Sequence, residues 1–439
     1  MKSRCERPLT VQLADDLYAA LGEARLVDYA RMLLQPVKDK DYTLESELSG
    51  SVNLEAPYTT PWRTIMVANS PGQLLENNDF ILNLNDPCAI KDTSWIKPGK
   101  VIRDVTLSTE GSKACIDFAV EHNLQYVELD AGWYGPEGDA ASDATTITKN
   151  FKKSGNQAPL DLHEIIRYGE ERGIGIIVYV NRRALETQLD DILPLYKKWG
   201  IKGIKYGFVN VGTQHWTTWL HEAIRKAADY EMLVDVHDEY RPTGYSRTYP
   251  NFMTQEGIRG NEEMPPALHN VTLPFTRYLC GAGDYTICWY NQRVKNTLAH
   301  QLGALIAFYS PLQFVFWYDQ PKAYKGEPGV ELFDYVPTVW DDTKVLHGKI
   351  GSYASIARKS GDDWFVGTLN AGEERTLSIP LGFLDDGKTY TAYIYSDGAP
   401  DGSNRTALNA TTRTVTPGDT IQAHMAANGG HAIRLRIEQ

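Results

Sequence analysis

The sequence has few cysteines, and none of them stands in a CxxC pair. Zinc fingers and redox-active dithiols need such closely spaced pairs, so the spacing argues against both. An odd, sparse set is more typical of buried free thiols than of a disulfide framework. The five cysteines are Cys5, Cys88, Cys115, Cys280 and Cys288.

Long apolar runs are also lacking. No uninterrupted stretch reaches the roughly 18 residues that a membrane-spanning helix needs. The first residues, MKSRCERPLTVQL, do not contain the apolar segment of a signal peptide. We therefore expect a soluble chain with no membrane partner, whose cellular compartment the sequence does not encode.

A basic tract is the third missing feature. The chain has 44 Lys and Arg against 56 Asp and Glu, which gives a formal net charge of -12. Proteins that bind nucleic acid neutralise its phosphates with clustered cations, and this sequence has no such cluster. The composition therefore argues against a nucleic-acid partner.

Strand and helix patterns alternate through the middle of the sequence. Apolar runs such as IGIIVYV at 174–180 are typical of strands buried on both faces, and helical spacing of apolar residues follows, as in 189–196. About eight such units in residues 91–350 predict a closed (β/α)8 TIM barrel. Expected strands lie at 101–107, 124–130, 174–180, 201–208, 232–236, 251–254 and 312–316, and expected helices at 111–122, 162–172, 189–196, 216–227 and 294–307.

Short β patterns flank this region on both sides. Residues 1–90 contain brief alternating runs separated by Asp, Gly, Pro and Asn, and they are too short for a complete large sandwich. Residues 351–439 contain strand patterns with turn residues at short intervals, which predict a small antiparallel sandwich. The expected fold is therefore α/β: a TIM barrel with a partial N-terminal β-sandwich segment and a C-terminal antiparallel β-sandwich domain.

Polar residues stand where the expected barrel strands end. Chemistry in a TIM barrel takes place at the carboxyl ends of the strands, which gives these residues more weight than ordinary surface acids. Residues 232–264 are the richest stretch, with carboxylates that are costly to gather unless protons or a cation use them. The residues at the strand ends are Asp130, Asn181, Gly207, Asp238 and Glu256.

Two of these features suit a sugar substrate. A protonated and an ionised carboxyl group on opposite sides of a cleft can cleave a glycosidic bond. Aromatic rings can stack on the apolar face of a pyranose, while Asp, His and Lys reach its hydroxyls; core packing is an equally good interpretation of each tryptophan. The residues placed for sugar contacts are Trp95, Trp133, Tyr134, Asp130, Lys205 and His237.

The surplus of acids also suggests a hard cation. Calcium takes six to eight oxygen ligands, and Glu256 and Asp238 can donate some of them. Surface salt bridges are the better explanation for three other acids, Asp235, Glu239 and Glu263. A transition-metal hydrolase is disfavoured because His237 has no HxH or HExxH companion.

Several motifs taken together resemble glycoside hydrolase family 97, the calcium-dependent α-glucosidases and α-galactosidases of gut bacteria. The resemblance implies a β-super-sandwich, a (β/α)8 barrel and a C-terminal β domain, with residues 1–90 a remnant of the first. Family members are usually exported to the periplasm. The motifs are LGEARLVDY at 21–29, TPWR at 60–63, DTSWIKPGK at 92–100, LDAGWYG at 129–135, KWGIKGIKYGF at 198–208, RPTGYSRTYPN at 241–251, QEGIRGNE at 255–262 and PTVWDDTKVL at 337–346.

The resemblance also implies roles for individual residues. Glu262, at the end of RGNE, matches the general acid, and we expect it to be buried among other acids. Glu256 matches a calcium ligand, and Glu23 resembles the ligand that the N-terminal domain supplies. Asp238 stands where inverting members carry a Glu that activates water and touches calcium.

Two positions bear on the stereochemistry. Retaining members carry an Asp nucleophile on the fourth strand and a Gly after the fifth-strand His, whereas this chain has Gly207 and Asp238. Both positions follow the inverting pattern, although Asn181 replaces the Glu that inverting members carry after the third strand. The expected function is calcium-dependent, inverting cleavage of terminal α-linked glucose or galactose from oligosaccharides. A retaining α-galactosidase and an inactive carbohydrate-binding protein are the alternatives.

Overall fold

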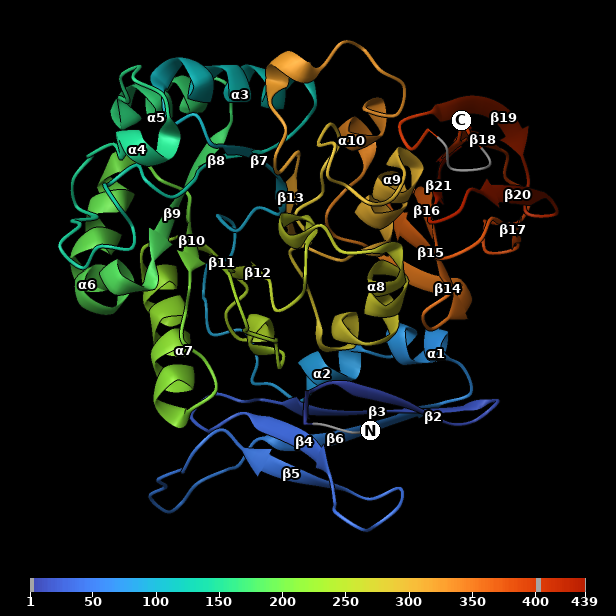
Figure 1. The fold of residues 1–439 in the computed structure, drawn as a ribbon, viewed down its shortest axis with the longest axis horizontal. Coiled ribbons are helices and arrows are strands. Elements are labelled where there is room, and N and C mark those ends of the chain that lie inside the picture. The colour runs from blue at the N-terminus through green and yellow to red at the C-terminus, as the bar shows by residue number, and fades with distance from the viewer. Residues whose placement is uncertain (1–3, 400–403, 439) are drawn as a thin grey trace.

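The computed structural model describes residues 4–399 and 404–438. A parallel barrel with its surrounding helices forms the middle of the molecule (Figure 1). Two small sheets from the N-terminal residues lie at one side of it, and an antiparallel sheet from the C-terminal residues lies at another. The α/β fold class that the sequence predicts is confirmed.

Seven parallel strands pair in the order β12-β11-β10-β9-β8-β7-β13. Their positions agree with the apolar runs of the sequence to within a few residues, because strands buried on both faces need such runs. The strands are β7 (Gly99–Asp104), β8 (Tyr126–Leu129), β9 (Gly175–Asn181), β10 (Gly203–Gly207), β11 (Leu233–Val236), β12 (Phe252–Gln255) and β13 (Leu312–Val315).

An irregular segment, 283–288, occupies the gap between β12 and β13. The amide of Asp284 donates to the Gln255 carbonyl at 2.9 Å, and the amide of Ile287 donates to the Phe314 carbonyl at 3.1 Å. The segment thus contacts both edge strands without forming a regular ladder. Seven strands and this irregular segment, which takes the place of an eighth strand, together close the barrel.

Helices cover the outside of the barrel. The predicted stripe on α6 is buried, and Asn181 begins that helix because its side chain accepts a hydrogen bond from the Arg183 amide. The helices are α3 (Thr109–Glu121), α4 (Phe151–Ser154), α5 (Leu162–Glu170), α6 (Arg182–Trp199), α7 (Gln214–Asp229), α8 (Ala267–Thr272), α9 (Leu298–Ala307) and α10 (Glu331–Tyr335). Short 3-10 turns lie at Tyr245–Arg247, Asn261–Glu263, Leu273–Phe275, Arg277–Cys280 and Pro321–Ala323.

The N-terminal residues form two three-stranded sheets, ordered β1-β4-β5 and β2-β3-β6. Backbone bonds join them to the barrel loops, as where the Arg25 amide donates to the Thr243 carbonyl at 3.0 Å. The elements are β1 (Cys5–Glu6), β2 (Leu9–Ala14), β3 (Leu17–Ala24), β4 (Met32–Pro36), β5 (Leu44–Leu48) and β6 (Trp62–Ala68), followed by α1 (Pro71–Glu76) and α2 (Asp79–Asn83).

The C-terminal residues form a six-stranded antiparallel sheet, β14-β15-β16-β21-β18-β19, and a two-stranded sheet, β17-β20. The first strand begins at Asp342, before the boundary expected at residue 351. The strands are β14 (Asp342–Lys349), β15 (Tyr353–Ser360), β16 (Asp363–Asn370), β17 (Arg375–Pro380), β18 (Tyr390–Asp397), β19 (Leu408–Val415), β20 (Thr420–Met425) and β21 (Gly430–Ile437). Among residues 4–399 and 404–438, none of the helices combines the length and apolarity of a membrane span.

Candidate active site

The interior of the barrel changes from apolar to charged along its strands. Residues two apart on a strand face the same side, so each strand contributes a series of inward side chains. The first inward layer packs into one apolar cluster that includes Val101, Tyr126, Ile177 and Leu233. Nearer the carboxyl ends, the same faces carry Arg103, Glu128, Asp130, Tyr179, Lys205, Asp235 and His237.

Trp317, just after β13, lies at the centre of this charged layer. The Arg103 guanidinium is 4.1 Å from its ring centroid and the Lys205 ammonium is 3.9 Å away. The His237 ring stacks on it at 5.8 Å with an interplanar angle of 11°. The buried indole therefore stabilises three cationic or ionisable groups through its ring face.

The pKa values of two acids at the end of β8, Glu128 within the strand and Asp130 just after it, are shifted in opposite directions. Burial acts to raise the pKa of Asp130, but Arg103, whose Nε is 2.8 Å away, and Lys205 lower it to about 2. Burial raises the pKa of Glu128 to about 8 despite the attraction of Lys205. Both Glu128 carboxylate oxygens are buried and lack a hydrogen-bond partner within the described residues. At neutral pH, Asp130 is ionised and Glu128 carries a proton.

His237, at the end of β11, stands among three acids. Its Nε2 is 2.8 Å from Asp284 Oδ2, and its Nδ1 is 3.4 Å from Glu256 Oε2. Burial and Lys205 lower the pKa of His237, but Glu256 and Asp235 raise it well above its ordinary value. We infer a buried imidazolium that holds these carboxylates together.

Asp238 and Glu256 are linked through the backbone at the barrel mouth. The Asp238 amide donates to Glu256 Oε2 at 2.7 Å, and the Gly257 amide donates to the Asp238 carbonyl at 2.7 Å. Burial raises the pKa of Glu256 to about 7, and it also raises the pKa of Asp238. Asp238 has a φ of 85°, a conformation that favours glycine and is common at functional sites.

Glu262 completes this group from the 3-10 turn after β12. One of its carboxylate oxygens, one Glu256 oxygen and one His237 nitrogen all lie within 4.8 Å of one another. Glu262 is exposed, so our expectation that it would be buried is wrong. Its amide donates to the Thr286 hydroxyl at 3.2 Å, so Glu262 is bonded to the irregular segment 283–288.

Arg277, which we did not predict for the site, holds the loop that carries Glu256. Its buried guanidinium donates to the carbonyls of Gln255, Glu256 and Gly257 at 3.2, 2.7 and 3.2 Å. Five donors on a rigid plane suit such a set of carbonyls. Arg277 is therefore a positioning residue for the mouth of the barrel.

A cavity of about 470 Å³ opens beside Asp238 and Glu256, a size typical of small-ligand sites. Glu6 of β1 and Arg241 also line it, and their side chains are 3.8 Å apart. Of the described residues, Glu262 does not line this cavity, although its carboxylate is close to that of Glu256.

Three of the residues predicted for the site lie elsewhere. Glu23 is buried on β3 between Arg7, at 2.9 Å, and Arg63. Trp133 is fully buried and donates through Nε1 to the Tyr179 carbonyl at 2.8 Å, in agreement with core packing. Trp95 precedes β7 and packs at the opposite end of the barrel. The structure does bring Asp130, Lys205, His237, Asp238, Glu256 and Glu262 to the upper half of the barrel.

Arg103, Glu128, Tyr179, Asp284 and Trp317 are further interior residues that we did not predict for the site. The signal for the first two is in the sequence, because each lies two residues before or after an inward apolar residue of its strand. Asp284 and Trp317 follow irregular backbone and carry no such periodic signal. Glu6 stands on the N-terminal strand that reaches the cavity, a role that the sequence led us to expect for Glu23.

The donor set at the mouth is suitable for a hard cation. Glu256 and Glu262 offer carboxylate oxygens, and Asp238 lies beside Glu256. Calcium prefers oxygen ligands, so His237 is better suited to hold the carboxylates than to ligate. The burial that raises the pKa of Glu256 also indicates a carboxylate that a bound cation would stabilise.

Comparison with known proteins places all three regions in one family. Residues 1–87 match the family model described as glycosyl-hydrolase 97 N-terminal, and residues 95–258 match glycoside hydrolase 97. Residues 339–436 match glycosyl-hydrolase 97 C-terminal, oligomerisation.

Two curated relatives are similar over most of this chain. A retaining alpha-galactosidase of Bacteroides thetaiotaomicron is 30% identical over 417 residues, which cover 87% of this chain and 61% of the relative. A probable retaining alpha-galactosidase of Streptomyces bingchenggensis is 31% identical, with 87% and 59% covered. The chain therefore spans about three fifths of the length of these relatives.

Solved structures of similar fold include enzymes of the same family. A glycoside hydrolase family 97 enzyme in complex with acarbose, from Pseudoalteromonas sp. strain K8, superposes with a TM-score of 0.91 at 28% identity, covering 100% of this chain and 75% of that chain. A beta-arabinopyranosidase superposes with a TM-score of 0.80 at 20% identity, covering 98% of this chain and 71% of that chain, a likeness of fold alone.

Proposed function

The chain belongs to glycoside hydrolase family 97, and we propose that it hydrolyses terminal α-linked glucose or galactose from oligosaccharides. One observation carries the proposal. The carboxyl groups of Glu262 and Glu256 converge with His237 at the carboxyl ends of the barrel strands, and the backbone amide of Asp238 donates to Glu256 Oε2. Such a set can supply both the acid and the base of glycoside hydrolysis.

We assign the acid role to Glu262 and the base role to Asp238. Exposed Glu262 is free to meet the oxygen of a leaving sugar and to donate its proton there. Asp238, whose carboxylate form is favoured by the charge of His237 and by a backbone hydrogen bond from Phe208, is the group that accepts a proton from the attacking water. An inverting pair needs a separation of about 6.5–9.5 Å to admit that water.

The fourth strand supports inversion. Retention needs a nucleophile close to the sugar, and Gly207 has no side chain to supply one. The Tyr179 ring also fills the space above Gly207, since a Cβ there would lie 2.1 Å from Tyr179 Cε2. A retaining α-galactosidase is the second candidate, because both curated relatives carry that name.

Calcium is the cofactor that we propose for this site. Glu256 and Asp238 would hold it, and Glu6 is the acid of the N-terminal sheets that lines the same cavity. A bound calcium ion would supply positive charge that keeps nearby carboxylates ionised. Carboxylates from this chain leave several of the usual six to eight oxygen positions for water.

Substitution of the acid tests the proposal. Glu262→Gln should reduce hydrolysis of α-glucosides and α-galactosides by about a hundredfold or more, the usual contribution of a general acid. Glu222→Gln is the matched control, because Glu222 is exposed on the outer helix α7 and pairs with Arg225 at 2.6 Å. Equal rates in wild type and Glu262→Gln would contradict the role of Glu262, and no turnover by wild type would favour a carbohydrate-binding protein.

A chelator tests the cofactor separately. Treatment with a calcium chelator should lower both the activity and the melting temperature of the wild type, because an ion bound only to the folded state stabilises it. Calcium should restore both, and restoration should need more calcium in Glu256→Gln. Activity that is unchanged after chelation would contradict a calcium requirement.

A further inference from the structure

We propose that a cavity between the barrel and the helices α1 and α2 is a second carbohydrate site, which binds one or two neutral sugar units without cleaving them. The cavity has a volume of about 530 Å³ and lies among α1, α2, β12 and β14. Pro98 and Pro311 line it just before β7 and β13 begin, so it opens at the amino ends of the strands. Pro242 and Gln255 also line it, so it extends along β12 toward the loops of the barrel mouth, but Asp238, Glu256 and Glu262 are not among its lining residues.

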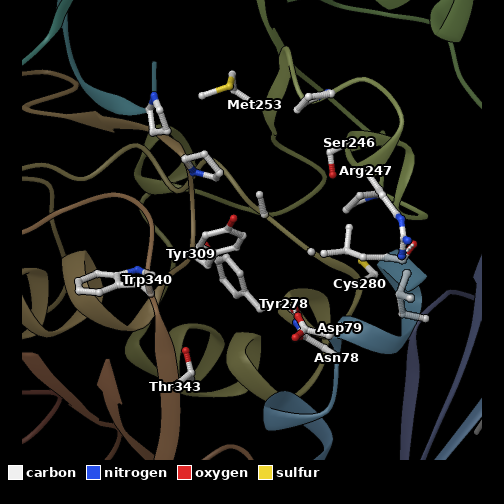
Figure 2. Close-up of a pocket in the computed structure, with 18 of the residues that line it drawn as sticks. Asn78, Asp79, Ser246, Arg247, Met253, Tyr278, Cys280, Tyr309, Trp340 and Thr343 are labelled. Carbon is white, nitrogen blue, oxygen red and sulfur yellow. Dashed lines mark hydrogen bonds between the residues drawn. The ribbon is translucent and has the colours of Figure 1, made fainter. Parts of the chain in front are cut away.

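Three aromatic side chains form one wall of this second site. Figure 2 shows Tyr278 and Tyr309 near the centre of the view and Trp340 beside them. Tyr278 stacks on Phe308 at 5.0 Å, and the Trp340 ring meets Phe365 edge-on at 5.6 Å, so both rings are held in place. Tyr309 and Trp340 are partly exposed, which leaves ring surface for the C–H face of a pyranose.

Polar groups line the other side of the cavity. Ser246, Asn78 and Asp79 lie across from Trp340 (Figure 2). Asn78 Nδ2 donates to the Tyr278 carbonyl at 3.1 Å, which fixes the amide and leaves its oxygen as an acceptor. Hydroxyl, amide and carboxylate groups opposite aromatic rings match a ligand with one apolar face and a rim of hydroxyls.

The charges around the cavity disfavour an anionic ligand. Four carboxylates line it, those of Glu76, Asp79, Asp341 and Asp342, against the guanidinium groups of Arg247 and Arg358. Buried Arg358 already donates to two carbonyls and to the Thr343 hydroxyl at 2.9 Å. An anion would meet a net negative lining, whereas the hydroxyls of a sugar can both donate and accept.

The role that we assign to this site is to hold an oligosaccharide near the enzyme. A second attachment point raises the effective concentration of a long substrate. This inference goes beyond the proposed function, because binding here does not require that the barrel mouth be catalytic.

Calorimetric titration with maltotriose and with raffinose tests the proposal. The full chain carrying Glu262→Gln should bind at two sites, and adding Trp340→Ala should abolish one of them or weaken it at least tenfold. Ser246→Phe, which fills the cavity from the opposite wall, should have the same effect and covers the case in which Trp340→Ala fails to fold. Trp62→Ala removes a half-exposed tryptophan on β6 and should leave both binding events unchanged.

A single binding event that neither Trp340→Ala nor Ser246→Phe alters would overturn the proposal, and so would the absence of binding to either sugar. Failure of the proposed function gives a different result. In that case wild type shows no turnover, but the binding event that depends on Trp340 and Ser246 is still measured with wild-type protein.

Discussion

The Tyr179 ring on β9 occupies the space that any side chain at Gly207 on β10 would need. A Cβ on Gly207 would lie 2.1 Å from Tyr179 Cε2 and 2.3 Å from its hydroxyl oxygen. Asn181 Nδ2 donates to that hydroxyl at 3.1 Å, so a hydrogen bond also fixes the position of the ring. The identities of residues 179 and 207 are therefore coupled.

Gly207→Ala should lower the free energy of unfolding by about 1–3 kcal/mol, the usual cost of overpacking a dense interior. Thermal unfolding followed by circular dichroism measures the change. In a Tyr179→Ala background the ring is absent, and the same substitution should cost less. An equal loss in both backgrounds would show that the ring is not the obstacle.

Asp238→Gly should separate stability from activity. The residue has a φ of 85°, which glycine adopts without strain, so the melting temperature should be unchanged or higher. Loss of the base should reduce turnover by about a hundredfold or more. A variant that unfolds at a much lower temperature would mean that the Asp238 side chain mainly supports the fold.

Lys205→Met should destabilise the barrel interior. Lys205 is buried, which lowers its pKa, but the attraction of the surrounding acids, ionised Asp130 among them, outweighs burial and raises it. Removing one partner of a buried ionic group costs about 3–5 kcal/mol. Lys202→Met, three residues earlier and exposed, is the matched control and should change stability by less than about 0.5 kcal/mol. Equal effects would contradict the account of the charged layer.

Glu128 should make stability fall as pH rises. Burial raises its pKa in the folded chain to about 8, from about 4.3 when unfolded. Between these values the folded chain binds more protons than the unfolded chain, so the free energy of unfolding decreases with increasing pH. The stability of wild type relative to Glu128→Gln should therefore decline in melts at about pH 5, 7 and 9. A constant difference would contradict the raised pKa.

The sequence predicted the barrel well because its strands are buried on both faces and need apolar runs, as at 174–180 for β9. It did not predict that segment 283–288 takes the place of an eighth strand. Contacts with β12 and β13 hold this segment, and its residues show no periodic pattern. The positions of Asp238, Glu256 and Glu262 together followed from their place at or after strand ends. The exposure of Glu262 depends on loops whose packing the sequence does not encode.

Local sequence does not distinguish between similar residues on neighbouring elements. Glu6 and Glu23 both lie on N-terminal strands, but only the packing of those sheets against the barrel decides which one lines the cavity. Trp133 and Trp317 both follow barrel strands as well. Helices cover Trp133, whereas Trp317 turns inward over Lys205, and no local pattern distinguishes them.

The stereochemistry of the first product tests the central claim most directly. NMR of an α-glycoside during the first turnovers reports which anomer the enzyme releases before mutarotation. Attack by a water that Asp238 activates, with Glu262 as proton donor, predicts that the β anomer appears first. Release of the α anomer first would contradict the account, because it requires a nucleophile on the enzyme.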